Sequence, residues 1–403
     1  MEPDVVIVGG GAIGAASALE LARGGASVTL LERGPHLAAG CSAGNAGLIC
    51  PSHSVPIANP AALRDGLRWM LRPDSPFYLR PRPGVLPWLA RFARASTATR
   101  SAAGAKAVRE LSVASLDLHA ELAAQGLDTG FERRGTLSVY ESEAAFAAAL
   151  TSVDGEVLAS DEVRELEPAL TGELAGGIYH RDEAHCDPLG FVEAVGRAAA
   201  EAGTAIRTGV EVRRLRPGPV VETSEGEFRP RIVVLAAGAW SSRLARGLGV
   251  FLPLEGGKGY HVDLEPAPGD PKVPLFMQEA RTIATPLRDR LRLSGTMELA
   301  GFDLTISERR VDAIRRALRR VLGDDSGRRV LETWAGLRPC TPDGLPVIGR
   351  VDGLVLATGH AMKGLSLAPV TAKLVGELVA GALPSYDLTP FSPRRFRPLL
   401  PLR

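Results

Sequence analysis

The hydrophobic pattern of the first 33 residues predicts a strand, a helix and a second strand. Residues 4–8 (DVVIV) and 27–31 (SVTLL) are short, mostly apolar runs, and small and aliphatic residues fill 12–23, which is followed by Gly24 and Gly25. Short continuous apolar runs are typical of strands buried on both faces of a parallel sheet. A Gly pair is a common end to a helix. We therefore predict two parallel strands joined by a helix over 12–23.

Two later apolar runs extend this parallel pattern. Residues 231–241 (RIVVLAAGAWS) and 353–360 (GLVLATGH) each read as a buried strand that ends in small residues before a helix, the last helix covering 365–380. A further helix is predicted after Asp187, which is an N-cap residue followed by Pro188, with Gly203 as its end. Strands that alternate with helices in this way predict a parallel sheet of Rossmann type.

The middle of the chain has a different pattern. Polar and apolar residues alternate through 252–299, which is typical of an antiparallel sheet, and a helix over 308–322 closes this part. A long helix is predicted over 102–125 and a strand over 135–140. The prediction is a composite α/β fold. Its Rossmann-like cofactor domain comprises 1–60, 185–250 and 330–403, and a discontinuous substrate domain comprises 61–184 and 251–329.

The turn after the first strand carries a glycine motif. Gly9, Gly11 and Gly14 fit GxGxxG within the segment GGGAIG. The first glycine permits the tight turn, the second lets the backbone approach a pyrophosphate, and the third lets the helix pack closely on the strand. Glu32 follows at the end of the second strand, where a carboxylate accepts hydrogen bonds from ribose hydroxyls and disfavours NADP. The motif predicts a dinucleotide site for NAD or FAD.

Two other segments are rich in small residues. A plain NAD domain would continue with another helix and strand after Glu32, but residues 38–53 read AAGCSAGNAGLICPSH. Such a loop lets backbone amides lie against a flat ligand. At 358–364 a buried strand runs through glycines into a helix N-terminus, whose positive dipole suits an anionic centre elsewhere on the same ligand.

Composition and charge exclude several classes of protein. The formal net charge is +1, so no global field attracts nucleic acid or anionic lipid. The four cysteines form no CxxC pair, which argues against a disulfide framework or a zinc site and suits a reducing cytosol. No signal peptide or membrane span is recognisable. We expect a cytoplasmic protein without a metal centre.

Residues 61–100 depart locally from this balance. This segment contains eight arginines but only two aspartates, and aromatic residues are interleaved with the arginines. One interpretation is a helix that lies on a membrane surface, peripheral to the inner face of the cell membrane. The other is an amphipathic cover whose aromatic residues pack inward while the arginines stay in water.

Taken together, these motifs resemble the D-amino-acid oxidase/dehydrogenase superfamily of FAD flavoproteins. The likeness spans nearly the whole chain through GxGxxG with Glu32, SAGNAG at 42–47, LAAGAWS at 235–241, and GLRPCTPDGLPVIG with ATGHAMKG at 336–364. GTMELAGFD at 295–303 and FSPRRF at 391–396 are most similar to the bacterial D-amino-acid dehydrogenase branch.

The resemblance implies FAD as the cofactor, with the glycine turn at the pyrophosphate, Glu32 at the adenosine ribose, the loop 42–47 beside the isoalloxazine and 359–364 at its pyrimidine end. The implied cofactor residues are Gly9, Gly11, Ala12, Ile13, Gly14, Glu32, Arg33, Ser42, Asn45, Ala46, Gly47, Val212, Ala237, Gly238, Gly359, His360, Met362, Lys363, Gly364 and Leu365.

The resemblance also implies catalytic residues. Arg338, in the GLRP motif, is expected to pair with the substrate carboxylate, as guanidinium is a bidentate clamp for that group. The alternative for Arg338 is a structural salt bridge. Tyr260 is favoured over its neighbour His261 to face the flavin, with core packing as the alternative. His53 is expected to border the active site unless it is an ordinary polar residue.

The activity implied is FAD-dependent oxidative deamination of a D-amino acid. The α-hydrogen passes as hydride to the flavin, and the imino acid hydrolyses to a 2-oxo acid and ammonia; a quinone, another acceptor or dioxygen then takes the electrons. Three alternatives remain: oxidation of a secondary amino acid such as sarcosine or hydroxy-D-proline, a flavoprotein subunit that needs partner chains, and an NAD-dependent dehydrogenase. Covalent attachment of the flavin through Cys41, Cys50 or Cys340 also stays open.

Overall fold

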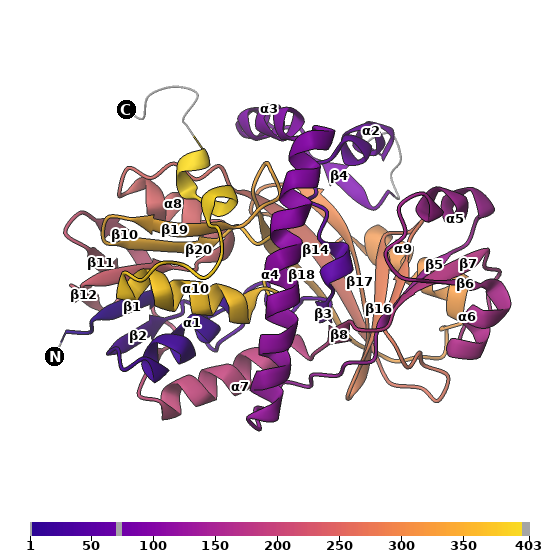
Figure 1. Ribbon diagram of the computed structural model, residues 1–403, viewed down its shortest axis with the longest axis horizontal. Coiled ribbons are helices and arrows are strands. Elements are labelled where there is room, and N and C mark those ends of the chain that lie inside the picture. The colour runs from indigo at the N-terminus through magenta and orange to yellow at the C-terminus, as the bar shows by residue number, and fades with distance from the viewer. Residues whose placement is uncertain (1, 70–74, 397–403) are drawn as a thin grey trace.

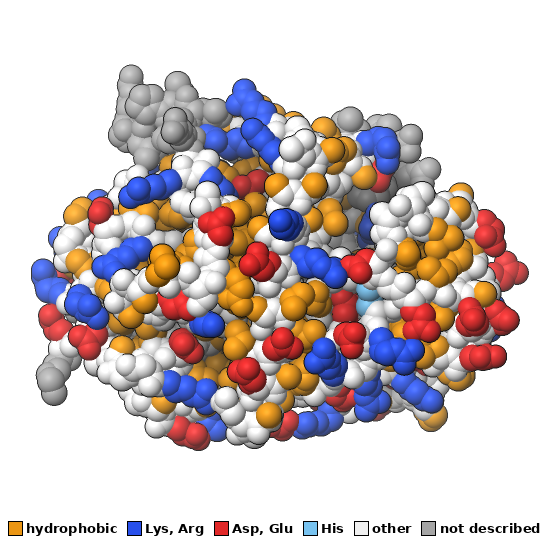
Figure 2. All heavy atoms as spheres, viewed as in Figure 1, with side chains coloured by type: hydrophobic (Ala, Val, Ile, Leu, Met, Phe, Trp, Pro, Cys, Tyr) orange, Lys and Arg blue, Asp and Glu red, His pale blue; other side chains and the backbone are white. Residues whose placement is uncertain are grey.

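The computed structural model describes residues 2–69 and 75–396, which form two lobes, each built on its own sheet (Figure 1). One lobe carries both the first strand and the last helix of the chain, and the other carries the long antiparallel strands. The predicted mixed α/β fold class is confirmed. Lys and Arg side chains are interspersed with Asp and Glu over the face shown in Figure 2, in keeping with the small net charge.

The first lobe is a six-stranded sheet whose order follows from the apolar runs. Every residue of its strands β1, β2, β13 and β20 is buried, as expected for a sheet covered on both faces. The strand order is β19 (Val347–Val351), β20 (Leu354–Thr358), β13 (Ile232–Leu235), β1 (Val5–Val8), β2 (Val28–Leu31), β9 (Ala205–Arg207). Only β19 runs antiparallel to its neighbour.

Helices cover this sheet where the sequence predicts them. α1 (Ala12–Arg23) packs between α7 (Pro188–Glu201) and α10 (Ala368–Ala380). Asp187 caps α7 by accepting hydrogen bonds from the amides of Leu189 and Gly190, both at 2.9 Å. The other face meets a small antiparallel sheet of β10 (Val212–Arg216), β11 (Val220–Thr223) and β12 (Gly226–Phe228).

The second lobe is a nine-stranded, mainly antiparallel sheet. Its order is β18 (Val330–Cys340), β14 (Glu255–Leu264), β17 (Arg290–Leu299), β16 (Thr282–Leu287), β15 (Leu275–Met277), β5 (Thr136–Tyr140), β7 (Gly176–His180), β6 (Glu156–Ala159), with β4 (Phe77–Leu79) added beside β17. Two pairings, β15 with β5 and β17 with β4, are parallel. α9 (Glu308–Leu322) covers one face and buries Ile314 and Leu318 against it.

The strand pairing of β18 differs from the predicted division into two domains. β18 pairs with β14 along its length, so residues 330–340 belong to the nine-stranded sheet, although the division assigns them to the cofactor domain. α4 (Ala98–Ala124) stands between the lobes in Figure 1 and packs against α10. The division itself stays a prediction.

The remaining elements are short. They are α2 (Pro60–Trp69), α3 (Leu86–Ala95), α5 (Glu143–Leu150), α6 (Ser160–Leu166), α8 (Ser241–Arg246), β3 (Leu48–Ile49), β8 (Ala184–His185) and five 3₁₀ turns at Pro51–His53, Pro83–Val85, Gly238–Trp240, Thr389–Phe391 and Pro393–Arg395. Within 2–69 and 75–396, no helix combines the length and apolar character needed to span a bilayer.

Candidate functional site

A large cavity lies between the two sheets. Its volume is about 1880 Å³, and its walls come from the glycine turn, the loop 39–46, the ends of β13 and β20, and strands β14, β17 and β18. Pockets for single small ligands measure roughly 300–1000 Å³. This cavity is therefore large enough for a dinucleotide together with a second, smaller ligand.

The glycine turn has the geometry that the motif predicts. Gly9 has a φ of +109°, and a Cβ there would lie 2.6 Å from the carbonyl oxygen of Ala236. A Cβ at Gly14 would lie 1.8 Å from the carbonyl oxygen of Gly9, so α1 packs on β1 only because this position is glycine. The turn thus places the N-terminus of α1 at the cavity wall, where an anionic phosphate is stabilised.

Glu32 lies at the same end of the cavity. Its carboxylate accepts hydrogen bonds from the amides of Gly10 and Gly34, both at 2.7 Å. A carboxylate has about four acceptor positions, so two remain for hydroxyls of a ligand. Glu32 lines the cavity beside Arg33, whose guanidinium lies 3.6 Å from the ring centroid of Trp240. These contacts fit the adenosine half of a dinucleotide.

The loop 42–47 connects distant segments of the chain. The Asn45 side chain donates to the carbonyl of Met362 at 3.1 Å and accepts from the amide of Gly47 at 2.9 Å. The indole of Trp334 lies against Gly44, where a Cβ would come within 2.1 Å of it. The loop and residues 360–365 therefore form neighbouring walls of one cavity, although they are more than 300 residues apart.

Arg338 projects from β18 into the same cavity. Its Nη1 donates to the carbonyl of Thr296 at 2.7 Å, and within the described part of the chain no carboxylate forms an ion pair with it. Burial lowers the pKa of this guanidinium, opposed only by the nearby Cys340 and Cys41 thiols. A buried charge without a partner is costly. Among the residues that the structure describes, the structural salt bridge that was the alternative for Arg338 is not found, and the site suits a carboxylate ligand.

His53 and Lys363 form the side wall. The His53 ring stacks on Phe276 with centroids 4.8 Å apart, and the Lys363 ammonium donates to the carbonyl of His53. Burial lowers the pKa of His53 to about 4, against the opposing effect of Glu183. Burial also lowers the pKa of Lys363 to about 8. At neutral pH this wall presents a neutral imidazole and a cationic lysine.

One group of donors on this wall could in principle hold a metal ion. Donor atoms of Cys50, His53 and Glu183 lie within 4.8 Å of one another. Burial raises the pKa of the Cys50 thiol well above its ordinary value, and the Lys363 cation lies nearby. Since a metal needs a thiolate and competes with this cation, the arrangement does not favour a metal site.

Most of the predicted site residues line the cavity. These are Arg338, His53, Gly9, Gly11, Ala12, Ile13, Glu32, Arg33, Ser42, Asn45, Ala46, Val212, Ala237, Gly238, His360, Met362, Lys363, Gly364 and Leu365. Gly14, Gly47 and Gly359 are not among the lining residues, but each adjoins one.

The prediction that Tyr260 faces the flavin is wrong, and its alternative, core packing, is what the structure shows. Tyr260 is 1% exposed, packs in the core of the second lobe, and directs its hydroxyl to the carbonyl of Thr305 at 3.5 Å, outside the cavity lining. Neighbouring strand residues face opposite sides. Gly259 lines the cavity, so Tyr260 points away from it, toward α9.

Several residues that surround Arg338 were not among the predicted site residues. A Cβ at Gly259 would lie 2.2 Å from Cζ of Arg338, and one at Gly336 would lie 1.9 Å from the Trp334 ring. Thr296, whose carbonyl binds Arg338, has a φ of +61°. Glycine inside a strand often marks a close approach, so the GGKG run at 256–259 was a signal for this site.

The predicted cysteine candidates differ in their access to the cavity. Cys41 and Cys50 line it, whereas Cys340 is fully buried outside its lining. Burial raises the pKa of all three thiols. All are free thiols, and thiolate chemistry is suppressed at each.

Comparison with known proteins gives a consistent result. The family model DAO, described as FAD dependent oxidoreductase, matches residues 4–378. A D-amino acid dehydrogenase of Cereibacter sphaeroides is 34% identical over 409 residues, covering 95% of this chain and 93% of the relative. A D-amino-acid oxidase of Bradyrhizobium diazoefficiens is 32% identical over 415 residues, covering 97% and 98%. The crystal structure of glycine oxidase from Geobacillus kaustophilus superposes with a TM-score of 0.80 at 27% identity, covering 99% of this chain and 100% of that one.

Proposed function

The chain belongs to the DAO family of FAD-dependent oxidoreductases, and from this membership we propose that it catalyses the oxidative deamination of a D-amino acid. The observation that carries the proposal is Arg338, a guanidinium at the cavity without a carboxylate partner among the described residues. An α-amino acid supplies the missing carboxylate.

FAD fits the features of the cavity. The cradle at Gly9 and Gly14 tolerates no side chain, and Glu32 offers free acceptor positions to a ribose. We place the pyrophosphate at this turn and the isoalloxazine between the loop 42–47 and residues 359–364, because these two segments contact each other and line the cavity together with Arg338. When bound there, FAD supplies the redox chemistry by taking up the two electrons that leave the substrate's C–N unit.

The side chains perform the positioning. Arg338 holds the carboxylate with a charge-assisted hydrogen bond pair, which fixes the direction of the α C–H bond. His53 is neutral at neutral pH, so it does not repel the substrate amino group. The imino acid formed by oxidation adds water and releases a 2-oxo acid and ammonia. Catalysis requires no side-chain nucleophile.

Product analysis tests this function. Purified protein with FAD and an artificial electron acceptor is expected to convert D-alanine to equimolar pyruvate and ammonia, with little turnover of L-alanine. Glycine and formaldehyde from sarcosine, with no product from any D-amino acid, would show that secondary amines are the substrates. Bound FAD without turnover of any amine would instead indicate a subunit that needs partner chains.

We also propose that the segment 61–100 mainly covers the cavity. Trp88 is buried and stacks on Phe92 with centroids 5.3 Å apart, and both line the cavity, whereas Arg64 and Arg80 are exposed. Residues 70–74, which include Arg72, lie outside the described residues. Leu63 and Leu86 are exposed in the same segment. They leave peripheral membrane contact, and with it a quinone as the electron acceptor, as the second candidate.

Liposome sedimentation separates the two roles of this segment. If it only covers the cavity, the protein stays in the supernatant with anionic vesicles at low salt. Salt-sensitive cosedimentation that is lost in the Leu63→Gln, Leu86→Gln double variant would establish the membrane contact. The pair Val113→Gln and Leu150→Gln, exposed on other elements, serves as the matched control.

A further inference from the structure

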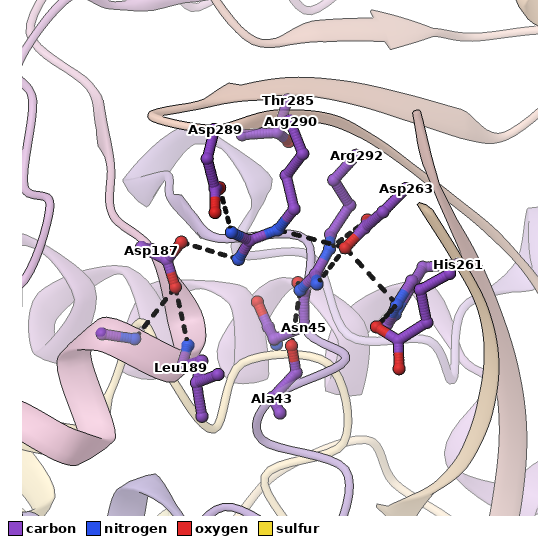
Figure 3. A network of polar contacts seen from close by, with 12 residues as sticks. Ala43, Asn45, Asp187, Leu189, His261, Asp263, Thr285, Asp289, Arg290 and Arg292 are labelled. Carbon is purple, nitrogen blue, oxygen red and sulfur yellow. Dashed lines mark hydrogen bonds and ion pairs between the residues drawn. The ribbon is translucent and has the colours of Figure 1, made fainter. Parts of the chain in front are cut away.

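Behind the loop 42–47 lies a buried ionic network that meets the loop at the carbonyls of Ala43 and Asn45 (Figure 3). Arg292 on β17 and Asp263 on β14 are cross-strand partners, and each side chain is 3% exposed. Two hydrogen bonds of 2.8 Å join them, from Nε to Oδ1 and from Nη2 to Oδ2. The remaining Nη1 of Arg292 faces the loop.

This nitrogen binds two carbonyl groups of the loop. Nη1 of Arg292 donates to the carbonyl of Ala43 and, at 3.0 Å, to the carbonyl of Asn45. All described peptide bonds are trans, so the N–H of each peptide group points opposite to its C=O. The N–H groups opposite these two carbonyls belong to Gly44 and Ala46. They therefore point away from Arg292.

These two amides are available to a ligand. Within the described chain, neither N–H donates to a protein acceptor, and both Gly44 and Ala46 line the cavity. Arg292 itself does not line it. A cation that binds the oxygen of a peptide group polarises the group, and hydrogen bonds in such a chain strengthen one another. The loop thus presents two strengthened donors to the cavity.

We propose that Arg292 is a positioning residue of the FAD site that acts through the amides of Gly44 and Ala46. It fixes the loop and relays positive polarity to the isoalloxazine, so that it stabilises the negative charge that reduction places there. The inference rests on the proposed placement of FAD, but it is independent of which amine is the substrate.

The surrounding contacts hold the relay rigidly between the lobes. Arg290 lies 3.1 Å from Asp263 and 2.6 Å from Asp187, which also caps α7. Thr285 donates to the carbonyl of Ala46 at 2.7 Å, so a third carbonyl of the loop is tied to the second lobe. His261, 3.8 Å from Asp263, adds no stable charge, because burial lowers its pKa.

The reduction potential of bound FAD tests this role. The double variant Arg292→Gln, Asp263→Asn removes the cation without leaving a buried charge unpaired. We expect it to lose about tenfold in its preference for reduced over oxidised FAD, which for a two-electron couple corresponds to a potential about 30 mV lower. The matched control is Arg328→Gln, Asp270→Asn, which removes a bidentate pair with bonds of 2.6 and 2.9 Å. Neither residue lines the cavity, so this variant should keep the wild-type potential.

A second variant tests the inference if the double variant does not fold or does not retain FAD. Arg292→Lys keeps the charge, but an ammonium cannot bind Asp263 bidentately and also bridge two carbonyls, so a smaller decrease in potential is expected. A wild-type potential in either folded, FAD-bound variant would overturn the inference. Absence of FAD from the wild-type protein would instead refute the FAD site on which the inference rests.

Discussion

Replacing Arg338 with methionine is expected to lower kcat/KM for a D-amino acid about 100-fold while FAD stays bound. Truncating one member of a buried charge pair costs about 2–5 kcal/mol, and each 1.4 kcal/mol is a factor of ten. Because no described carboxylate pairs with Arg338, its removal leaves no protein charge uncompensated. The loss should therefore fall on substrate binding and orientation rather than on folding.

Steady-state kinetics measure the change in kcat/KM. The flavin absorbance spectrum checks that FAD stays bound. Arg338→Lys should recover only part of the loss, since an ammonium lacks the bidentate fork. Arg328→Met is the matched control, because it also removes a partly buried arginine but from an ion pair away from the cavity. If Arg338→Met and Arg328→Met had equal kinetics, Arg338 would have no part in substrate recognition.

The second large effect is expected at Gly9. Gly9→Ala should lower the affinity for FAD more than 100-fold, because the new methyl group would lie 2.6 Å from a backbone oxygen at a φ of +109°. The turn can relieve this clash only by moving the amides that face the pyrophosphate. Titration of apoprotein with FAD, followed by quenching of flavin fluorescence, gives the dissociation constant.

A second glycine with a positive φ, just beyond the other end of α1, separates the clash from the unfavourable φ. Gly25 has a φ of +82° and nothing within 4 Å of a Cβ, so Gly25→Ala carries only the conformational cost of about 1–2 kcal/mol in stability. It should bind FAD like the wild type. Equal FAD affinities of the Gly9→Ala and Gly25→Ala variants would contradict a cradle at Gly9.

The fold could be predicted from the sequence where the pattern is local. The apolar runs at β1, β2, β13 and β20 follow directly from burial on both faces, and Asp187 with Pro188 marks the start of α7. Strand pairing is not local. That β18 extends the second sheet, rather than the first, depends on contacts with β14, which is about 70 residues away in the sequence.

Parts of the site could be predicted where a close approach of the backbone requires glycine or another small residue. Glycines marked the turn at Gly9 and the loop 42–47, and Arg338 followed from the family likeness as the residue expected to pair with a carboxylate. The side that a strand residue faces could not be predicted. Tyr260 and His261 differ only in register, and the alternation around Gly259 turned Tyr260 into the core.

The network behind the loop had no sequence signal. Arg292, Asp263 and Asp187 are scattered over more than 100 residues, and charged residues are ordinarily exposed. Only the fold brings them to one buried place behind residues 43–46. Its contribution to the site is therefore visible only in three dimensions.

An anaerobic spectrum tests the central claim most directly. Purified protein reconstituted with FAD should show the absorbance of an oxidised flavin, and the addition of D-alanine without oxygen should bleach it, whereas L-alanine should leave it nearly unchanged. Bleaching by no D-amino acid, or equal bleaching by the two enantiomers, would contradict the proposal that this cavity oxidises D-amino acids.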